Sequence, residues 1–138
     1  MQNIKARSFV LIMVIIAATA LILRFAIGCI IKMNIAQNES NASVTLKFIS
    51  AALQNYARDH NGNFPSDLAL LANNTPPYLD DDDVAKSPVK GYNYVCARLE
   101  PSGYSCSATP LKCGLTGTAS YTISTGGLIV SEECNKKE

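Results

Sequence analysis

Two patterns of apolar residues occupy the first half of the chain. Residues 9–31 are apolar except at three positions, Thr19, Arg24 and Gly28. A helix of that length extends about 34 Å, enough to cross the hydrocarbon core of a bilayer. Residues 38–60 contain no Pro or Gly, and their apolar side chains recur every three or four residues at Leu46, Ile49, Leu53 and Tyr56. The two patterns predict one helix that runs to His60, where Asn61-Gly62 and Pro65 end it.

The second half of the chain changes to the two-residue alternation of strands. Residues 92–99 and 104–108 alternate on either side of the turn Pro101-Ser102-Gly103, which predicts a hairpin. Residues 119–123 and 128–130 flank Gly126-Gly127 and predict a second one. Before the strands, Ser66 is expected to cap a short helix that runs to about Leu71. The predicted fold class is α+β, with a long N-terminal helix, half membrane-spanning and half amphipathic, packed on a four-stranded antiparallel sheet.

The domain organisation follows from these patterns. We expect a short basic leader at residues 1–8, the transmembrane half of the helix at 9–31, and a domain outside the cytoplasm at 32–138. Lys5 and Arg7 precede the apolar segment, and the positive-inside rule keeps such a head in the cytoplasm. The apolar segment is longer than that of a cleaved secretory signal. An alternative is lipidation of Cys29, because residues 26–29 resemble a bacterial lipobox.

Arg24 is the one charged residue within the apolar segment. Its long side chain can extend to the outer interface of the membrane, or it can pair with a partner helix inside an assembly.

Charge argues against nucleic acid as a partner. The formal net charge is +1, but four basic residues lie in the first 32 positions, and the remaining 8 basic and 11 acidic residues give residues 33–138 a net charge of −3. Affinity for nucleic acid depends mainly on cations that meet phosphates. We therefore expect no nucleic-acid binding.

The sequence contains no motif for catalysis, a cofactor or a metal, so we expect a protein that is not an enzyme. His60 is the one histidine and lies beside Asp59 at a predicted helix end, where a structural role is expected. The run Asp80-Asp81-Asp82-Asp83 is read as a solvated turn, with a divalent-cation site as the alternative.

Four cysteines lie outside the membrane segment and are disulfide candidates: Cys96, Cys106, Cys113 and Cys134. Three connectivities are possible. Cys96 and Cys106 fall opposite each other, or one residue off, across the first hairpin, which favours Cys96–Cys106 together with Cys113–Cys134.

Several motifs resemble type IV pilin-like proteins, including the pseudopilins of type II secretion. The helix segment Leu46 to Tyr56 resembles the family's L-x-x-I-x-x-A-x-x-x-Y, and residues 61–65 match its N-G-x-[YF]-P. Further similar segments follow in the family's order, at residues 76–79, 91–94, 108–110, 114–118 and 126–129. The resemblance covers about residues 38–132 and implies a structural subunit of a type IV pilus-like or pseudopilus filament.

The resemblance also implies roles for residues of the first helix. Prepilin cleavage would fall between Ser8 and Phe9, which leaves Met13 where the family has a glutamate. That is compatible with a minor, initiating or capping subunit, or with an uncleaved anchor that carries a pilin-like domain for binding or adhesion. The helix contacts expected in a filament are Phe9, Met13, Ile16, Leu23, Arg24 and Ile31.

The implied partners are the membrane, copies of the chain or other pilin-like subunits, and the inner-membrane assembly machinery. The implied location is the bacterial inner membrane, crossed once, and a periplasmic or cell-surface filament after assembly. No cofactor is expected.

Overall fold

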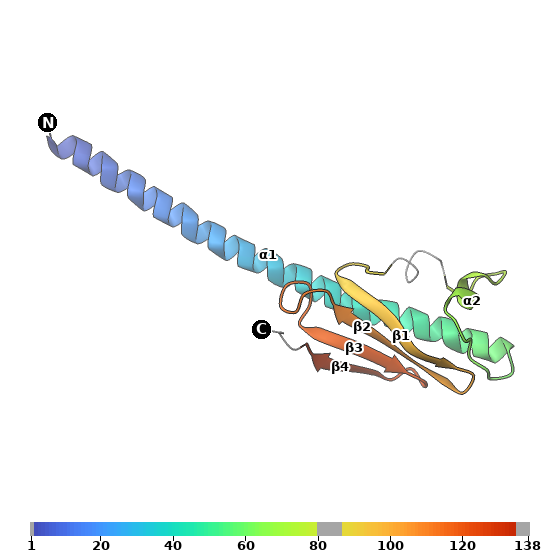
Figure 1. Ribbon diagram of the computed structural model, residues 1–138. Helices are drawn as coiled ribbons and strands as arrows, with labels where there is room; N and C mark the ends of the chain where they lie inside the picture. Colours follow the sequence, from blue (N-terminus) through green and yellow to red (C-terminus); the bar gives the residue numbers. More distant parts are fainter. Residues whose placement is uncertain (1, 80–86, 135–138) are drawn as a thin grey trace. The chain divides into compact units, whose positions relative to one another are not determined.

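The computed structural model describes residues 2–79 and 87–134. It contains helix α1 (Gln2–Asp59), the short helix α2 (Ala69–Ala72), and strands β1 (Tyr92–Glu100), β2 (Gly103–Pro110), β3 (Ala119–Ser124) and β4 (Ile129–Glu133) (Figure 1). The chain divides into two compact units, residues 1–34 and 35–138. The first unit is helical, and the second combines the rest of α1 with the sheet.

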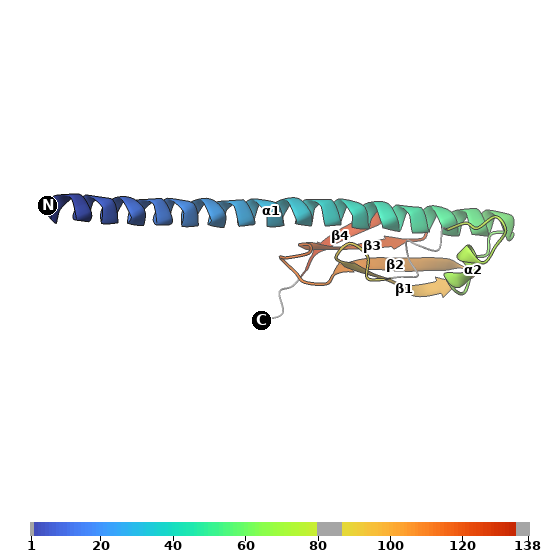
Figure 2. The same cartoon turned by 90° about the horizontal axis from the view of Figure 1, so that it is seen from above.

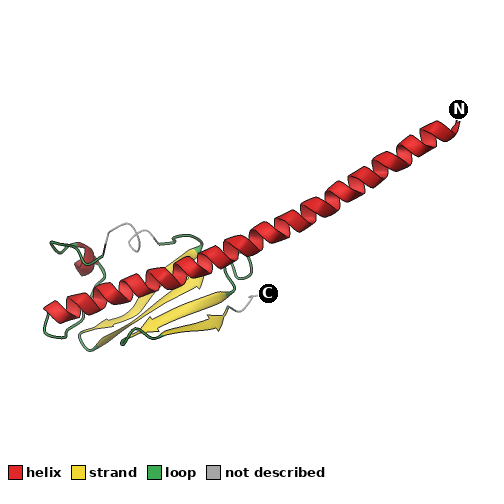
Figure 3. Cartoon of the chain, turned by 180° about the vertical axis from the view of Figure 1, so that it is seen from behind, coloured by secondary structure: helices red, strands yellow, loops and turns green. Residues whose placement is uncertain are grey.

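The strands form one antiparallel sheet in the order β1-β2-β3-β4. Within the second unit, residues 35–59 of α1 lie along one face of this sheet, as the turned view shows (Figure 2). The predicted α+β class is confirmed, with both hairpins in their predicted places (Figure 3).

The core of the second unit lies between α1 and the sheet. From α1, Leu46, Ile49 and Leu53 are at most 1% exposed. The facing side chains come from alternate strand positions, and the largest of them are Tyr92, Tyr104 and Ile123. Burial of each such side chain contributes about 1.5–3 kcal/mol. The predicted apolar stripe is therefore the face of α1 that holds the sheet.

The end of α1 agrees with its predicted stop signal. The helix ends at Asp59, one residue before the predicted His60. Asn61 and Gly62 have positive φ angles of 56° and 86°, and the Gly62 N–H donates to the Ala57 carbonyl at 2.7 Å. This left-handed ending satisfies a carbonyl that the last turn would leave free.

The predicted cap of the short helix is wrong. Helix α2 begins at Ala69, its N-cap position is Leu68, and no hydrogen bond joins the Ser66 hydroxyl to its first turn within the described residues. The side chain of Asp67 takes that role, because its Oδ1 accepts the Ala69 N–H at 3.1 Å. Helix α2 is also shorter than the predicted segment from residue 66 to 71.

Candidate functional site

The apolar half of α1 is exposed on all sides within the first unit. Its large apolar side chains from Phe9 to Ile30 are between 52% and 81% exposed. Helix α1 is the one helix within residues 2–79 and 87–134 that is long and apolar enough to cross a membrane. Soluble monomers rarely expose so large an apolar surface, so the helix is compatible with a membrane anchor.

The structure places the predicted filament contacts along this helix, and five of the six are exposed. Phe9, Met13, Ile16 and Leu23 are 54–63% exposed, Ile31 is half-buried and Arg24 is exposed. Neighbours such as Leu11 and Ile22 are exposed just as much. Exposure therefore does not favour one face of the helix over another.

Within the apolar half of α1, one side chain of the described residues forms a hydrogen bond. The Thr19 hydroxyl donates to the Ile16 carbonyl at 2.9 Å, which satisfies it within the helix. Ser8 and Cys29 are exposed, and Cys29 is the one free cysteine of the described residues. Neither the predicted cleavage position nor the lipidation alternative is tested by this geometry.

The outer face of the second half of α1 carries a second apolar feature. Val44 and Phe48 are one helical turn apart, lie off the buried stripe, and are 45% and 62% exposed. Sequence reasoning missed this pair, although its four-residue spacing is visible. The amphipathic half of α1 thus has a buried face toward the sheet and a small apolar patch on the opposite side.

The start of the second unit is held by a polar clamp between α1 and the β2–β3 loop. Thr118 donates its backbone N–H and its hydroxyl to Glu39 Oε1, at 2.7 and 2.6 Å. The side-chain amide of Asn38 donates to the Thr116 carbonyl at 3.0 Å. The clamp joins residues almost eighty positions apart, which no local pattern in the sequence reveals.

Two tyrosines, the buried Tyr92 and the half-buried Tyr121, support the same region. Tyr92 donates its hydroxyl to the Ala119 carbonyl at 2.7 Å, and its ring leaves no room for a side chain at Gly117. Burial raises the pKa of Tyr92 and of Tyr121, and the negative charge of Glu39 raises both pKa values further. Both phenols therefore stay neutral well above ordinary pH.

A buried hydroxyl pair joins α1 to the middle of the sheet. Ser50 Oγ lies 2.6 Å from the Tyr104 hydroxyl oxygen, and both side chains are at most 4% exposed. The Gln54 amide donates to the same Oγ at 3.3 Å. The pair fixes where α1 sits on the sheet, since a shift would leave two buried hydroxyls without partners.

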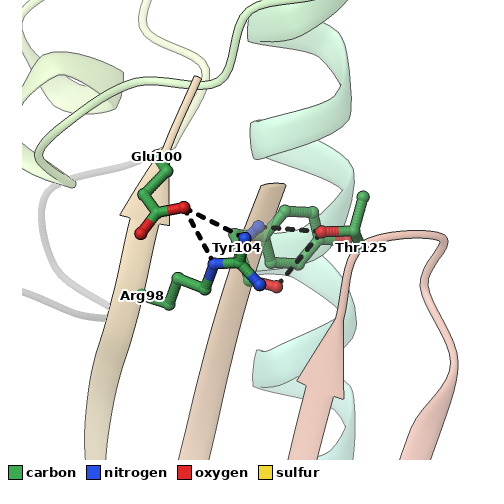
Figure 4. A network of polar contacts seen from close by, with 4 residues as sticks. All are labelled: Arg98, Glu100, Tyr104 and Thr125. Atoms are coloured by element: carbon green, nitrogen blue, oxygen red, sulfur yellow. Dashed lines mark hydrogen bonds and ion pairs between the residues drawn. The ribbon is translucent and has the colours of Figure 1, made fainter. Parts of the chain in front are cut away.

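The start of β2 is joined to the β3–β4 turn through Thr125. The Tyr104 N–H donates to Thr125 Oγ1 at 2.8 Å, beside an exposed pair in which Arg98 contacts Glu100 at 3.0 Å (Figure 4). An exposed pair of this kind contributes at most about 1 kcal/mol. The Tyr104–Thr125 hydrogen bond therefore does more than this ion pair to fix the start of β2.

Two disulfides staple the sheet, and they join the pairs that the hairpin register favours. Cys96 and Cys106 are direct cross-strand partners, followed by a bulge before Arg98. Cys113–Cys134 links the β2–β3 loop to the end of β4. Together they hold β1 to β2 and both ends of the segment from 113 to 134.

The end of α1 carries an aromatic cluster. The His60 ring stacks on Tyr56 with centroids 3.8 Å apart, and its Nδ1 lies 2.8 Å from the Tyr56 carbonyl oxygen. Tyr78 donates its hydroxyl to Asp59 at 2.5 Å, and this hydrogen bond raises the pKa of Tyr78. His60 therefore has the structural setting of a ring packed at a helix end.

The described residues contain no group of three or more His, Cys, Asp or Glu side chains placed to hold a metal ion. The run Asp80 to Asp83, the alternative cation site, lies outside the described residues.

Comparison with known proteins identifies the fold. No family model matches the chain, and no curated protein sequence matches it either. Among solved structures, the crystal structure of the non-core minor pilin PilV of Neisseria meningitidis is similar, with a TM-score of 0.51 and 20% identity. The match covers 78% of this chain and 94% of that one. The chain therefore has a type IV pilin-like fold.

Proposed function

We propose that the protein is a structural subunit of a pilus-type filament, either a type IV pilus or a type II secretion pseudopilus. The observation that carries this proposal is the apolar helix 9–31, exposed on all sides as far as Ile30 and joined to a pilin-like sheet domain. A helix that apolar on every side needs surrounding apolar material, which a bilayer supplies before assembly and neighbouring helices supply afterwards.

In this proposal the assembly contacts run along one helix. They are Phe9, Met13, Ile16, Leu23, Arg24 and Ile31, and the exposed pair Val44 and Phe48 extends the apolar surface into the second unit. Transfer from lipid to protein then needs no exposure of the helix to water. The sheet domains form the outer layer.

The proposed partners are copies of this chain or other pilin-like subunits, the membrane, and assembly machinery in the inner membrane. The proposed orientation keeps the N-terminus in the cytoplasm and the sheet domain outside, supported by Lys5 and Arg7 before the apolar segment. A purely structural role without catalysis is part of the proposal, supported by the lack of a catalytic motif in the sequence.

Cross-linking in cells tests the assembly proposal. Single cysteines replace Ile16 or Leu23 in a Cys29→Ser background, and a short bifunctional maleimide joins neighbouring copies. Thr122→Cys, on the exposed outer face of β3, is the matched control. Because each chain then carries one free thiol, we expect cross-linked dimers from positions 16 and 23 and none from 122. Membrane-resident protein without such dimers would contradict assembly through this helix.

Met13 favours a second candidate, a fixed anchor that presents a pilin-like binding module, since the family's glutamate is replaced there. The intact mass of native protein separates the two. A chain that begins at Phe9 supports a processed filament subunit, whereas a chain that retains residues 1–8 supports the permanent anchor.

A further inference from the structure

The turn between β2 and β3 has an unusual surface. Leu111 and Leu115 are 55% and 47% exposed, and Lys112 between them is exposed too. Exposed leucines that lie singly need no explanation. Here two leucines and a lysine share one turn, which we call the 111–115 turn. Amphipathic helices that lie at a lipid interface present the same two kinds of side chain, apolar and cationic.

The 111–115 turn is fixed in place by its own hydrogen bonds. The Lys112 carbonyl accepts the N–H groups of Leu115 and Thr116 at 3.1 and 2.9 Å, and the Lys112 N–H donates to Thr116 Oγ1 at 3.0 Å. The disulfide Cys113–Cys134 holds its centre. A surface ordered in advance loses little conformational entropy when it binds.

A second cation lies beside this turn. Gly91 accepts the Leu111 N–H at 3.0 Å, and the exposed Lys90 precedes it. Among the described residues, the acidic ones at the same end of the sheet are Glu39, which accepts two hydrogen bonds from Thr118, and Glu132 and Glu133 on the opposite edge strand β4. The side of β1 and β2 therefore presents lysines.

The turn is also tied to a part of α1 close in sequence to the apolar segment. The side chain of Asn38 donates a hydrogen bond to Thr116, and Asn38 lies seven positions after Ile31 along α1. Seven helical residues extend about 10 Å, whereas the headgroup layer on each side of a bilayer is about 5–8 Å deep. This length of chain sets an upper limit on the distance between Asn38 and Ile31, the last residue of the apolar segment.

We propose that the 111–115 turn is a membrane-contact surface. Leu111 and Leu115 enter the boundary between headgroups and acyl chains, and Lys90 and Lys112 bind the phosphates of anionic phospholipids. The inference rests on the membrane anchor of the proposed function, and it adds that the sheet domain binds the lipid surface before assembly. Release from the surface is then a step that precedes entry into a filament.

Tryptophan fluorescence tests the contact, because the chain contains no Trp. Leu115→Trp places a probe in the turn, and Leu128→Trp is the matched control. Leu128 is 70% exposed and lies in the β3–β4 turn, at the other end of the sheet. The full chain is reconstituted at one copy per nanodisc, in phosphatidylethanolamine and phosphatidylglycerol with or without brominated acyl chains.

We expect the emission of the Leu115→Trp variant to shift to the blue and to be quenched by the brominated lipid, while the Leu128→Trp variant shows neither change. Adding Lys112→Gln should weaken the association of the turn with anionic lipid about fivefold, the equivalent of about 1 kcal/mol per cation. Phosphatidylcholine discs should reduce the quenching in the same way. Leu111→Trp repeats the measurement if the first variant fails to form both disulfides.

The other outcomes overturn the inference in distinguishable ways. If the Leu115→Trp variant behaves as the control variant does while the chain stays in the disc, the turn does not contact lipid and the anchor stands. If its emission shifts only with several copies per disc and bromine does not quench it, the contact is between copies. If carbonate washing removes the chain from membranes, the anchor fails, and the lipid contact fails with it.

Discussion

The buried pair Ser50 and Tyr104 allows a quantitative test of how α1 is held on the sheet. Ser50→Ala leaves the Tyr104 hydroxyl at 2% exposure without its partner, 2.6 Å away in the native protein. An unsatisfied buried hydroxyl costs about 1–3 kcal/mol. The better helix propensity of Ala offsets up to about 0.5 kcal/mol. We expect the free energy of unfolding to fall by about 1–2 kcal/mol.

Tyr104→Phe should cost less, because Ser50 keeps the amide of Gln54 as a donor at 3.3 Å. We expect a loss of about 1 kcal/mol. In the double variant neither hydroxyl remains, so the combined loss should not exceed that of Ser50→Ala alone. The difference between the sum of the single effects and the double effect is the coupling, expected at about 1 kcal/mol or more.

Urea unfolding of the full chain in detergent, followed by tyrosine fluorescence, measures all three variants. Tyr121→Phe is the control, because its half-buried hydroxyl has no hydrogen-bond partner within residues 2–79 and 87–134, and it should change stability by less than about 0.5 kcal/mol. Strict additivity of Ser50→Ala and Tyr104→Phe would refute the reasoning, since two hydroxyls that bond to each other must couple.

Three further predictions concern the β2–β3 region and its tyrosines. Gly117→Ala places a methyl group against the Tyr92 ring and should lower stability by about 1–3 kcal/mol in the same unfolding assay; a neutral result would contradict that close packing. Replacing Cys113 and Cys134 by Ser opens a link across 21 residues and should cost about 3 kcal/mol, seen as a lower urea midpoint; an unchanged midpoint would rule out this contribution. The pKa values of Tyr92 and Tyr78 are raised above 10.0, so the unfolded chain loses these two protons at a lower pH than the folded chain does. Their contribution to the free energy of unfolding should therefore be fully present below about pH 10 and be lost as the pH rises above it. Tyrosinate absorbance checks this prediction, and six tyrosines that titrate together in the folded protein would contradict it.

Local patterns in the sequence were sufficient for the elements of the fold. The three-and-four spacing of Leu46, Ile49 and Leu53 identified the face of α1 that the sheet buries, because a helix brings such positions onto one side. The alternation around Pro101-Ser102-Gly103 placed Cys96 opposite Cys106 or one residue off, and the structure makes the two direct partners. The bulge that follows Cys96 was not predicted, since a bulge interrupts the alternation used to find the strand.

Contacts between distant residues were beyond sequence reasoning. Glu39 is one polar residue among several on a predicted helix, and only the folded chain brings Thr118 to its carboxylate. Sequence reasoning assigned the short-helix cap to Ser66 for the same kind of reason, because the choice between Ser66 and Asp67 depends on where α2 begins. The apolar segment was found at once, yet its contact face stays a prediction, because nearly every position there is apolar.

The energetics of that segment bear on how a filament subunit of this kind would assemble. Fourteen large apolar side chains between Phe9 and Ile30 are exposed, and their transfer to water would cost on the order of 20 kcal/mol. Lipid tails and neighbouring helices are about equally apolar, so the hydrophobic effect does not by itself favour the filament over the bilayer. The difference must come from close packing between helices, from contacts between sheet domains, and from work done by assembly machinery. A lipid-bound 111–115 turn would oppose assembly, so variants that weaken the turn's hold on the membrane should enter filaments more readily than the native chain.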